Sequence, residues 1–219
     1  MITLEDVKAN KDISVYIEKA DYALKQLGFT EHSFAHVTKV SLKAGEILSE
    51  LGYSKREIEL AKIAGYLHDI GNIVNRIEHS QSGAVMAFRI LDRMDMEAED
   101  IATIVSAIGN HDEGTGVPVD AVSAALILAD KSDVRRSRVR NEDITSFDIH
   151  DRVNYSALGG GLTIENKNKI IRLTLDIDTK YSSIMDYFEI FLERMVLCRK
   201  AAEKLGMNFK LTINGQCLL

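Results

Sequence analysis

Residues 60–71 read LAKIAGYLHDIG, and this segment decides how the chain is interpreted. Its apolar residues recur at helical spacing after a Ser-x-x-Glu capping box at residues 54–57, and they lead directly into His68 and Asp69. Gly71 follows and is placed to turn the chain away. Because helical geometry breaks here, two adjacent side chains can approach one metal ion from different directions. The pattern predicts a buried helix that ends in a pair of metal ligands.

More helices are expected on both sides of this segment. Apolar residues recur at helical spacing over residues 13–27, 37–51, 84–91, 101–108 and 118–129. Short polar turns join these segments, as in a compact helical bundle. The first 140 residues therefore predict a helical domain.

The hydrophobic period changes after residues 140–150, which are polar and are interpreted as a linker. The expected elements are a short strand at 153–156, glycines 159–161 as the turn of a hairpin, a strand at 171–177, a helix at 183–205 and a last strand at 209–213. The sequence thus predicts a mainly α fold. We expect a helical metal domain over residues 1–140 and a small α+β unit over 141–219, in the order strand-strand-helix-strand.

Composition narrows the class of protein. The chain has 219 residues, 46% of them hydrophobic, and a net charge of −6. This charge disfavours bulk electrostatic binding to nucleic acid or to an anionic membrane. No apolar run approaches the ~20 residues of a membrane helix. The two cysteines, Cys198 and Cys217, lack ligand spacing and fit a reducing compartment, so we expect a cytoplasmic protein.

Histidines and carboxylates mark the ends or edges of successive predicted helices. They are, in chain order, His36, His68, Asp69, His79, His111 and Asp130. Imidazole and carboxylate together suit iron, manganese, cobalt or nickel, without singling out one. Each residue alone could be a hydrogen-bonded structural group or a helix cap. Their ordered occurrence on five helices favours a shared metal site.

The His-Asp dipeptide by itself carries little information in this chain. It occurs three times, as His68-Asp69, His111-Asp112 and His150-Asp151. His150 lies in the polar connector and is expected to form a surface pair or a hydrogen-bonding group. His32 lies one turn before His36 and competes with it for the first ligand position. Val37 and its apolar neighbours place His36 beside the buried face, so we favour His36.

The ordered set resembles the HD superfamily of metal-dependent phosphohydrolases. The pattern of that superfamily is a His, then a His-Asp doublet, then an Asp on a later helix, with two further histidines before the last Asp in dinuclear members. The matching positions are His36, His68, Asp69, His79, His111 and Asp130. The resemblance covers residues 30–135. The chain departs from many cyclic dinucleotide phosphodiesterases of this superfamily, which have lysine where Asn72 stands here.

The resemblance implies a pair of divalent transition-metal ions and a hydrolytic reaction. Asp69 would bridge the two ions, and it is therefore a candidate catalytic residue. The first ion would also take His36, His68 and Asp130, and the second His79 and His111. A water shared by the ions would become a hydroxide near neutral pH and attack phosphorus. The implied activity is hydrolysis of a phosphate ester or anhydride in a nucleotide-like small molecule.

Cations near these positions are candidates for binding the phosphate of a substrate. Arg76 lies between the doublet and His79, and Arg135 and Arg136 begin about one turn after Asp130. If the helix that contains Asp130 continues, Arg135 or Arg136 could reach a phosphate near the metals. The alternative is a solvated basic helix end, whose charge favours the helix dipole.

Three further residues are candidates for catalysis. Lys131 is next to a predicted ligand and could assist the leaving group or pair with a carboxylate. Asp112 and Glu113 directly follow His111, and either could orient water or donate a proton, or could merely cap a loop. Two other functions stay open: a diiron oxygenase on the same ligands, and a regulatory or dimerising module that binds metal and nucleotide without turnover. In the second case the C-terminal strands could pair with another subunit, so a homo-oligomer stays open as well.

Overall fold

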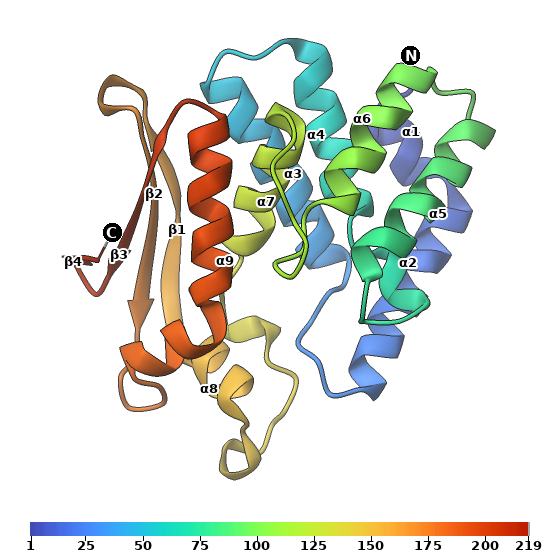
Figure 1. Cartoon of the computed structure of the whole chain (residues 1–219). Helices are drawn as coiled ribbons and strands as arrows, with labels where there is room; N and C mark the ends of the chain where they lie inside the picture. The colour runs from blue at the N-terminus through green and yellow to red at the C-terminus, as the bar shows by residue number, and fades with distance from the viewer. Residues whose placement is uncertain (219) are drawn as a thin grey trace.

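The computed structural model describes residues 1–218, which form a helical bundle and a small C-terminal sheet (Figure 1). The helices of the first part are α1 (Leu4–Ala9), α2 (Lys11–Gln26), α3 (Phe34–Glu50), α4 (Lys55–Leu67), η1 (Ile70–Ile73), α5 (His79–Arg93), α6 (Ala98–Gly109) and α7 (Ala121–Lys131). The second part contains η2 (Arg136–Arg138), η3 (Ile144–Ser146), α8 (Ile149–Ser156), β1 (Ala157–Glu165), η4 (Asn166–Asn168), β2 (Ile170–Ile177), α9 (Ile184–Lys204), β3 (Asn208–Ile213) and β4 (Gln216–Cys217). The mainly α fold class with a C-terminal α+β unit is confirmed.

Helix α7 is the centre of the bundle. Every residue from Val122 to Lys131 is buried, and α3, α4, α6 and α9 all pack against this helix. A helix that is apolar on all sides has to be covered on all sides. Asp120 starts it with a capping box to Ser123, so the helix expected from residue 118 begins at Ala121. Asp130 near its C-terminal end is thereby held in the interior.

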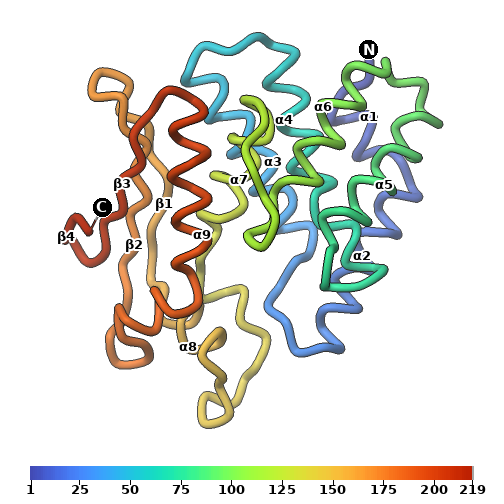
Figure 2. Tube along the Cα trace, in the orientation of Figure 1, coloured from blue at the N-terminus to red at the C-terminus, as the bar shows by residue number. Residues whose placement is uncertain are grey.

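The sheet and α9 form the C-terminal unit. The strand order is β1-β2-β3-β4, with antiparallel outer pairs and a parallel β2–β3 pair that α9 connects. Alternate residues Ile171, Leu173 and Leu175 of β2 are buried, as the sequence period predicts. Helix α9 lies between the sheet and α7 (Figures 1 and 2). This helix therefore links the C-terminal unit to the centre of the bundle.

Two expectations for the C-terminal unit are wrong. Residues 153–156 belong to helix α8, which Asp148 caps, and do not form a strand. Glycines 159–161 lie inside β1 and pair with β2, whereas the hairpin turns at η4. Gly160 has a φ of +148°, and a Cβ there would lie 2.3 Å from the Thr174 carbonyl oxygen. Glycine is normally depleted in strands, so three consecutive glycines favoured a turn. The close approach of the partner strand, which requires glycine here, has no sequence signal.

The buried apolar residues of both parts form one continuous cluster. Leu126 of α7, Leu197 of α9 and Leu173 of β2 all belong to it. The division at residues 140 and 141 stays a prediction. Within residues 1–218, no helix combines the length and the apolar character that crossing a membrane requires.

Candidate metal centre

Helix ends bring the six predicted ligands together at one place in the bundle. His36 lies in the first turn of α3, His68 and Asp69 directly follow α4, and His79 begins α5. His111 follows α6, and Asp130 lies in the last turn of α7. All six residues are buried in the structure, at 9% exposure or less for the whole residue. The distribution of these residues along the sequence therefore corresponds to one cluster in space.

One half of the cluster surrounds a single carboxylate oxygen of Asp69. Oδ2 of Asp69 lies 3.6 Å from Nε2 of His36 and 3.3 Å from Nε2 of His68. Oδ1 of Asp130 lies 3.3 Å and 3.6 Å from the same two nitrogens. Donor atoms that bind one ion at about 2.1 Å in neighbouring positions lie about 3.0–3.4 Å apart. Two of the four distances lie in this range and the other two exceed it by 0.2 Å, so the spacing is close to that of four ligands of one ion.

The other half of the cluster surrounds the second oxygen of the same carboxylate. Oδ1 of Asp69 lies 3.5 Å from Nε2 of His79, which in turn lies 3.1 Å from Nε2 of His111. Asn72 donates a hydrogen bond of 2.9 Å to this oxygen and fixes the carboxylate. Asp69 is thus positioned between two groups of imidazoles, as a bridging ligand would be.

The four clustered histidines share one hydrogen-bonding pattern, in which Nδ1 has an acceptor in the protein. Nδ1 of His36 donates to Asp133, and the Nδ1 atoms of His68, His79 and His111 donate to backbone carbonyl oxygens, at 2.7–3.1 Å. An acceptor at Nδ1 fixes the tautomer and directs Nε2 towards the ligand position. Metal-binding histidines have this second hydrogen bond almost always.

Unpartnered atoms in this cluster fit a cation. Nε2 of His36, Nε2 of His68 and Oδ2 of Asp69 are buried, and no hydrogen-bond partner for them exists among the described residues. Such atoms are costly unless an ion satisfies them. Burial lowers the pKa of the His68 imidazole, yet Asp69 and Asp130 raise it to about 10. The surroundings of His68 therefore stabilise positive charge, and the donor set of the cluster suits a divalent transition metal.

Gly71 allows the close packing that places the ligands. A Cβ on Gly71 would lie 2.0 Å from the carbonyl oxygen of His79 and 2.4 Å from the amide nitrogen of Gly83. Only glycine therefore lets η1 contact the start of α5 directly. The sequence predicted a glycine that turns the chain, and the structure adds the close approach.

A chain of ion pairs leads from the centre towards α9. Nζ of Lys131 lies 2.9 Å from Asp130 and 3.0 Å from Glu113, and Nε of Arg194 donates to Glu113 at 2.8 Å. Burial acts to lower the pKa of Lys131, but Asp130 and Glu113 raise it above its ordinary value. Burial acts in the opposite sense on Glu113, whose pKa Lys131 and Arg194 hold far below its ordinary value. Both groups are therefore charged at neutral pH.

Asp112 is held less tightly than its neighbour. Its Oδ1 lies 4.0 Å from Lys131, and its side chain is 27% exposed. Burial raises the pKa of Asp112 and Glu113 raises it further, although Lys131 lowers it. Of the two acidic residues after His111, Asp112 is therefore the one whose pKa is raised above its ordinary value.

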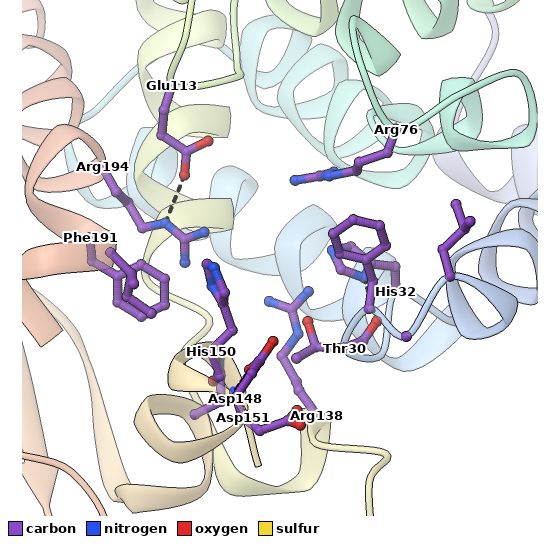
Figure 3. Close-up of a pocket in the computed structure, with 15 residues that line it drawn as sticks. Thr30, His32, Arg76, Glu113, Arg138, Asp148, His150, Asp151, Phe191 and Arg194 are labelled. Carbon is purple, nitrogen blue, oxygen red and sulfur yellow. Dashed lines mark hydrogen bonds and ion pairs between the residues drawn. The ribbon is translucent and has the colours of Figure 1, made fainter. Parts of the chain in front are cut away.

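A cavity of about 500 Å³ lies next to Arg76, His32 and Glu113 (Figure 3). Three of the residues that line it are arginines, namely Arg76, Arg138 and Arg194. Nη1 of Arg76 lies 3.4 Å from Nε2 of His79, so the cavity adjoins the centre. His32 and Glu113 also line it. His32 thus belongs to the cavity wall, while His36 occupies the cluster.

The structure does not bring Arg135 and Arg136 to this cavity. The helix does not continue past Lys131, where α7 ends, so the condition under which these arginines could reach the phosphate is not met. Arg135 pairs with Glu31 and Asp133, and the guanidinium of Arg136 lies over Tyr155, 4.3 Å from its ring centroid. Arg76 is the one of the three predicted arginines that lines the cavity.

Sequence reasoning missed two of the cavity arginines and set one histidine aside. Arg138 lies in the same basic run as Arg135, but the direction of each side chain depends on η2, which has no clear sequence signal. Arg194 lies on α9, about 60 residues beyond the predicted ligands. His150, interpreted as a surface group, is exposed but lies on the cavity wall, on α8.

Comparisons with known proteins agree with this arrangement. The chain matches the HD domain family over residues 33–150, a region that includes all six clustered residues. Relatives include an uncharacterised protein of Methanocaldococcus jannaschii, which is 25% identical over 67% of this chain and 65% of its own length. Ribonuclease Y 1 of Pediococcus pentosaceus is 26% identical over 77% of this chain and 31% of its own length. Ribonuclease Y of Sulfurimonas denitrificans is 31% identical over 54% of this chain and 21% of its own length.

The alignments span less than two thirds of the length of each of these relatives. A crystal structure of an HD superfamily hydrolase from an uncultured Thermotogales bacterium shares 23% identity and covers 61% of this chain and 75% of its own chain, with a TM-score of 0.47. The family match alone covers more than half of the chain. This protein belongs to the HD domain family.

Proposed function

We propose that this protein is a metal-dependent phosphohydrolase, which cleaves a phosphate ester or anhydride of a nucleotide-like small molecule. The observation that carries the proposal is the buried cluster of four imidazoles and two carboxylates beside an arginine-lined cavity. The family match supports the reaction class. The specific reaction and the nucleotide-like substrate are part of the proposal.

We propose two divalent ions in the centre, shared by Asp69. The ligands of the first would be His36, His68, Asp69 and Asp130, and those of the second would be Asp69, His79 and His111. Such a pair supplies positive charge for phosphoryl oxygens and lowers the pKa of water. The donor set is compatible with iron, manganese, cobalt or nickel.

The protein's own residues would bind and orient the substrate. Arg76 would donate to a phosphoryl oxygen, since its guanidinium lies between the cavity and His79. Lys131 would keep Asp130 in place through its ion pair of 2.9 Å. Asp112 would transfer a proton to the leaving oxygen, because its side chain is partly exposed and only distantly paired. Glu113 would act as the anchor that holds Lys131 and Arg194.

The cavity favours a small substrate. Its volume of about 500 Å³ is within the usual range for a small-molecule site. Residues of α8 and α9 line one side, including His150, Asn154 and Phe191, so the C-terminal unit helps to enclose the cavity. We propose that the reaction takes place in the cytoplasm, because the two cysteines of the sequence, Cys198 and Cys217, lack ligand spacing and fit a reducing compartment.

Hydrolysis of a phosphodiester in RNA is a second candidate. The similarity to proteins named ribonuclease Y favours it. The net charge of −6 opposes it, because a long polyanion is repelled by an acidic surface. The volume of the cavity, about 500 Å³, makes the small substrate the first choice.

The test begins with anaerobic purification and elemental analysis. The metal-free protein is then restored with each candidate metal and assayed on nucleotides, other phosphate esters and a short single-stranded RNA. Phosphate release from small molecules, lost in Asp112→Asn with metal content retained, is the expected result. Cleavage of RNA alone would select the second candidate. Full metal content without turnover on any substrate would select the regulatory module, and turnover that requires dioxygen would select the diiron oxygenase.

A further inference from the structure

Two of the cavity arginines belong neither to the metal cluster nor to the predicted substrate residues. Arg138 comes from η2 and Arg194 comes from α9, and both guanidinium groups point into the cavity (Figure 3). Arg76 enters from the opposite wall, next to His79. The two new arginines contact no candidate ligand directly among the described residues. They therefore create a separate cationic region of the cavity.

Arg138 is buried and only partly paired. Its side chain is 6% exposed, and its Nε and Nη1 donate to the backbone oxygens of Glu31 and Asp133, at 2.9 and 3.0 Å. The nearest carboxylate oxygen, on Asp133, is 3.9 Å from Nη1. Nη2 has no acceptor within residues 1–218. Burial and the nearby Arg194 lower the pKa of Arg138, although Asp133 acts to raise it. A buried cation held in this way is rigid and retains an unused donor group.

Arg194 is oriented in a similar way. Its Nε donates to Glu113, and its guanidinium carbon lies 4.1 Å from the centroid of the Phe191 ring. Both Nη atoms are without an acceptor in the described part of the chain. Because Glu113 also pairs with Lys131, one carboxylate serves two cations. The guanidinium is thus fixed in place by Glu113 and Phe191, and its Nη donors remain available.

The remaining acidic groups of the cavity do not neutralise these arginines. Asp148 caps the first turn of α8 by accepting from the amide of Asp151. Asp151 accepts from the side-chain amide of Asn141 at 3.2 Å. Neither carboxylate forms an ion pair with Arg138 or Arg194 in the structure of residues 1–218. Two fixed guanidinium groups with free donors are what a phosphate group binds best.

We propose that Arg138 and Arg194 bind a second phosphate group of the substrate, apart from the phosphate that is cleaved beside Arg76. The inference rests on the proposed function and narrows its substrate class to small molecules that carry two phosphate groups. These groups are either joined as a diphosphate or attached at separate positions. The C-terminal unit then has a role in recognition, since it supplies Arg194.

Binding of anions to the metal-loaded protein tests the proposal without turnover. The probes are orthophosphate, with one phosphate, and methylenediphosphonate, whose two phosphonates are not hydrolysed, both measured by isothermal titration calorimetry. Arg138→Gln and Arg194→Gln are each expected to raise the Kd of methylenediphosphonate about tenfold or more, the usual effect of losing a charged hydrogen bond. The Kd of orthophosphate is expected to stay within about twofold.

Arg199→Gln is the matched control, since Arg199 lies on α9 like Arg194 and its side chain is 56% exposed. It should change neither Kd. Arg138→Lys and Arg194→Lys keep the charge without the planar fork, and they replace any glutamine variant that fails to unfold cooperatively. Intermediate Kd values for methylenediphosphonate in these lysine variants support the proposal. The proposal is overturned if the glutamine variants weaken the binding of orthophosphate and methylenediphosphonate equally, or if they weaken the binding of neither.

A second pair of probes identifies the arrangement of the phosphates. They are the α,β-methylene analogue of adenosine diphosphate and adenosine 3′,5′-bisphosphate. The probe whose affinity falls when Arg138 or Arg194 is replaced shows how the two phosphates of the substrate are spaced. If the affinity of neither probe falls, the proposal is overturned. Absence of hydrolysis with every substrate would refute the proposed function alone, because the binding measurements do not need turnover.

Discussion

Asp133→Asn should weaken metal binding although Asp133 is not itself a predicted ligand. Oδ2 of Asp133 accepts from Nδ1 of His36 at 2.8 Å, and Oδ1 accepts from Lys39 at 2.6 Å and from Arg135 at 3.1 Å. The side chain is buried. Asparagine has nearly the same shape but only one acceptor oxygen. Its amide group must therefore face either the His36 N–H or the two cations.

The expected loss follows from this geometry. If the amide faces His36, the ring loses the acceptor that directs Nε2 towards the ion. If it faces Lys39 and Arg135, the carboxylate charge that supports the imidazole is still gone. Loss of such an outer partner costs about 10- to 100-fold in metal affinity. This corresponds to about 1.4–2.7 kcal/mol.

The assay is competition for the metal with a fluorescent chelator at fixed pH. Asp92→Asn is the matched control, since the Asp92 side chain is 53% exposed on α5 and pairs only with Arg89 at 3.8 Å. The control should bind metal with the wild-type affinity. Wild-type affinity in Asp133→Asn as well would refute the role of His36 as a ligand held in place by Asp133.

Two further substitutions test the packing and the ion pairs around the centre. Gly71→Ala should lower the free energy of unfolding in urea by about 3 kcal/mol or more, because the new Cβ would meet the His79 carbonyl oxygen at 2.0 Å; wild-type stability would contradict the close approach. Glu113→Gln should lower it by about 3 kcal/mol at pH 7, because Lys131 and Arg194 lose their shared carboxylate. The folded-state pKa of Glu113 is depressed, so its contribution is present above the unfolded value of about 4.3 and is lost as the pH falls below it. The stability difference between wild type and Glu113→Gln should therefore shrink in urea titrations between about pH 5 and pH 3, and a constant difference would contradict the depressed pKa.

The six clustered side chains could be predicted from the sequence because residues at helix ends can be recognised from the apolar pattern. Apolar spacing located α3 to α7, and the polar residues at their ends were then few. The apolar residues that follow His36 distinguished it from His32 as the candidate ligand. The structure places His36 in the cluster and His32 on the cavity wall. Local signals of this kind need no knowledge of how the helices pack.

The cavity could not be predicted in the same way because it depends on tertiary packing. Arg194 reaches it only because α9 packs against α7. Arg136 was expected there, but the chain leaves the helix after Lys131 and turns its guanidinium onto Tyr155. Gly160 misled the strand assignment, since a residue with φ of +148° inside a strand is set by its partner strand and not by its neighbours.

Metal content per chain is the most direct measurement of the central claim. Elemental analysis of anaerobically purified protein should give about two divalent ions in the wild type, about one in His111→Ala and close to none in Asp69→Ala. His150→Ala, which changes the His150-Asp151 doublet on the cavity wall, should match the wild type. Full occupancy in Asp69→Ala would contradict the assignment of this carboxylate as the shared ligand.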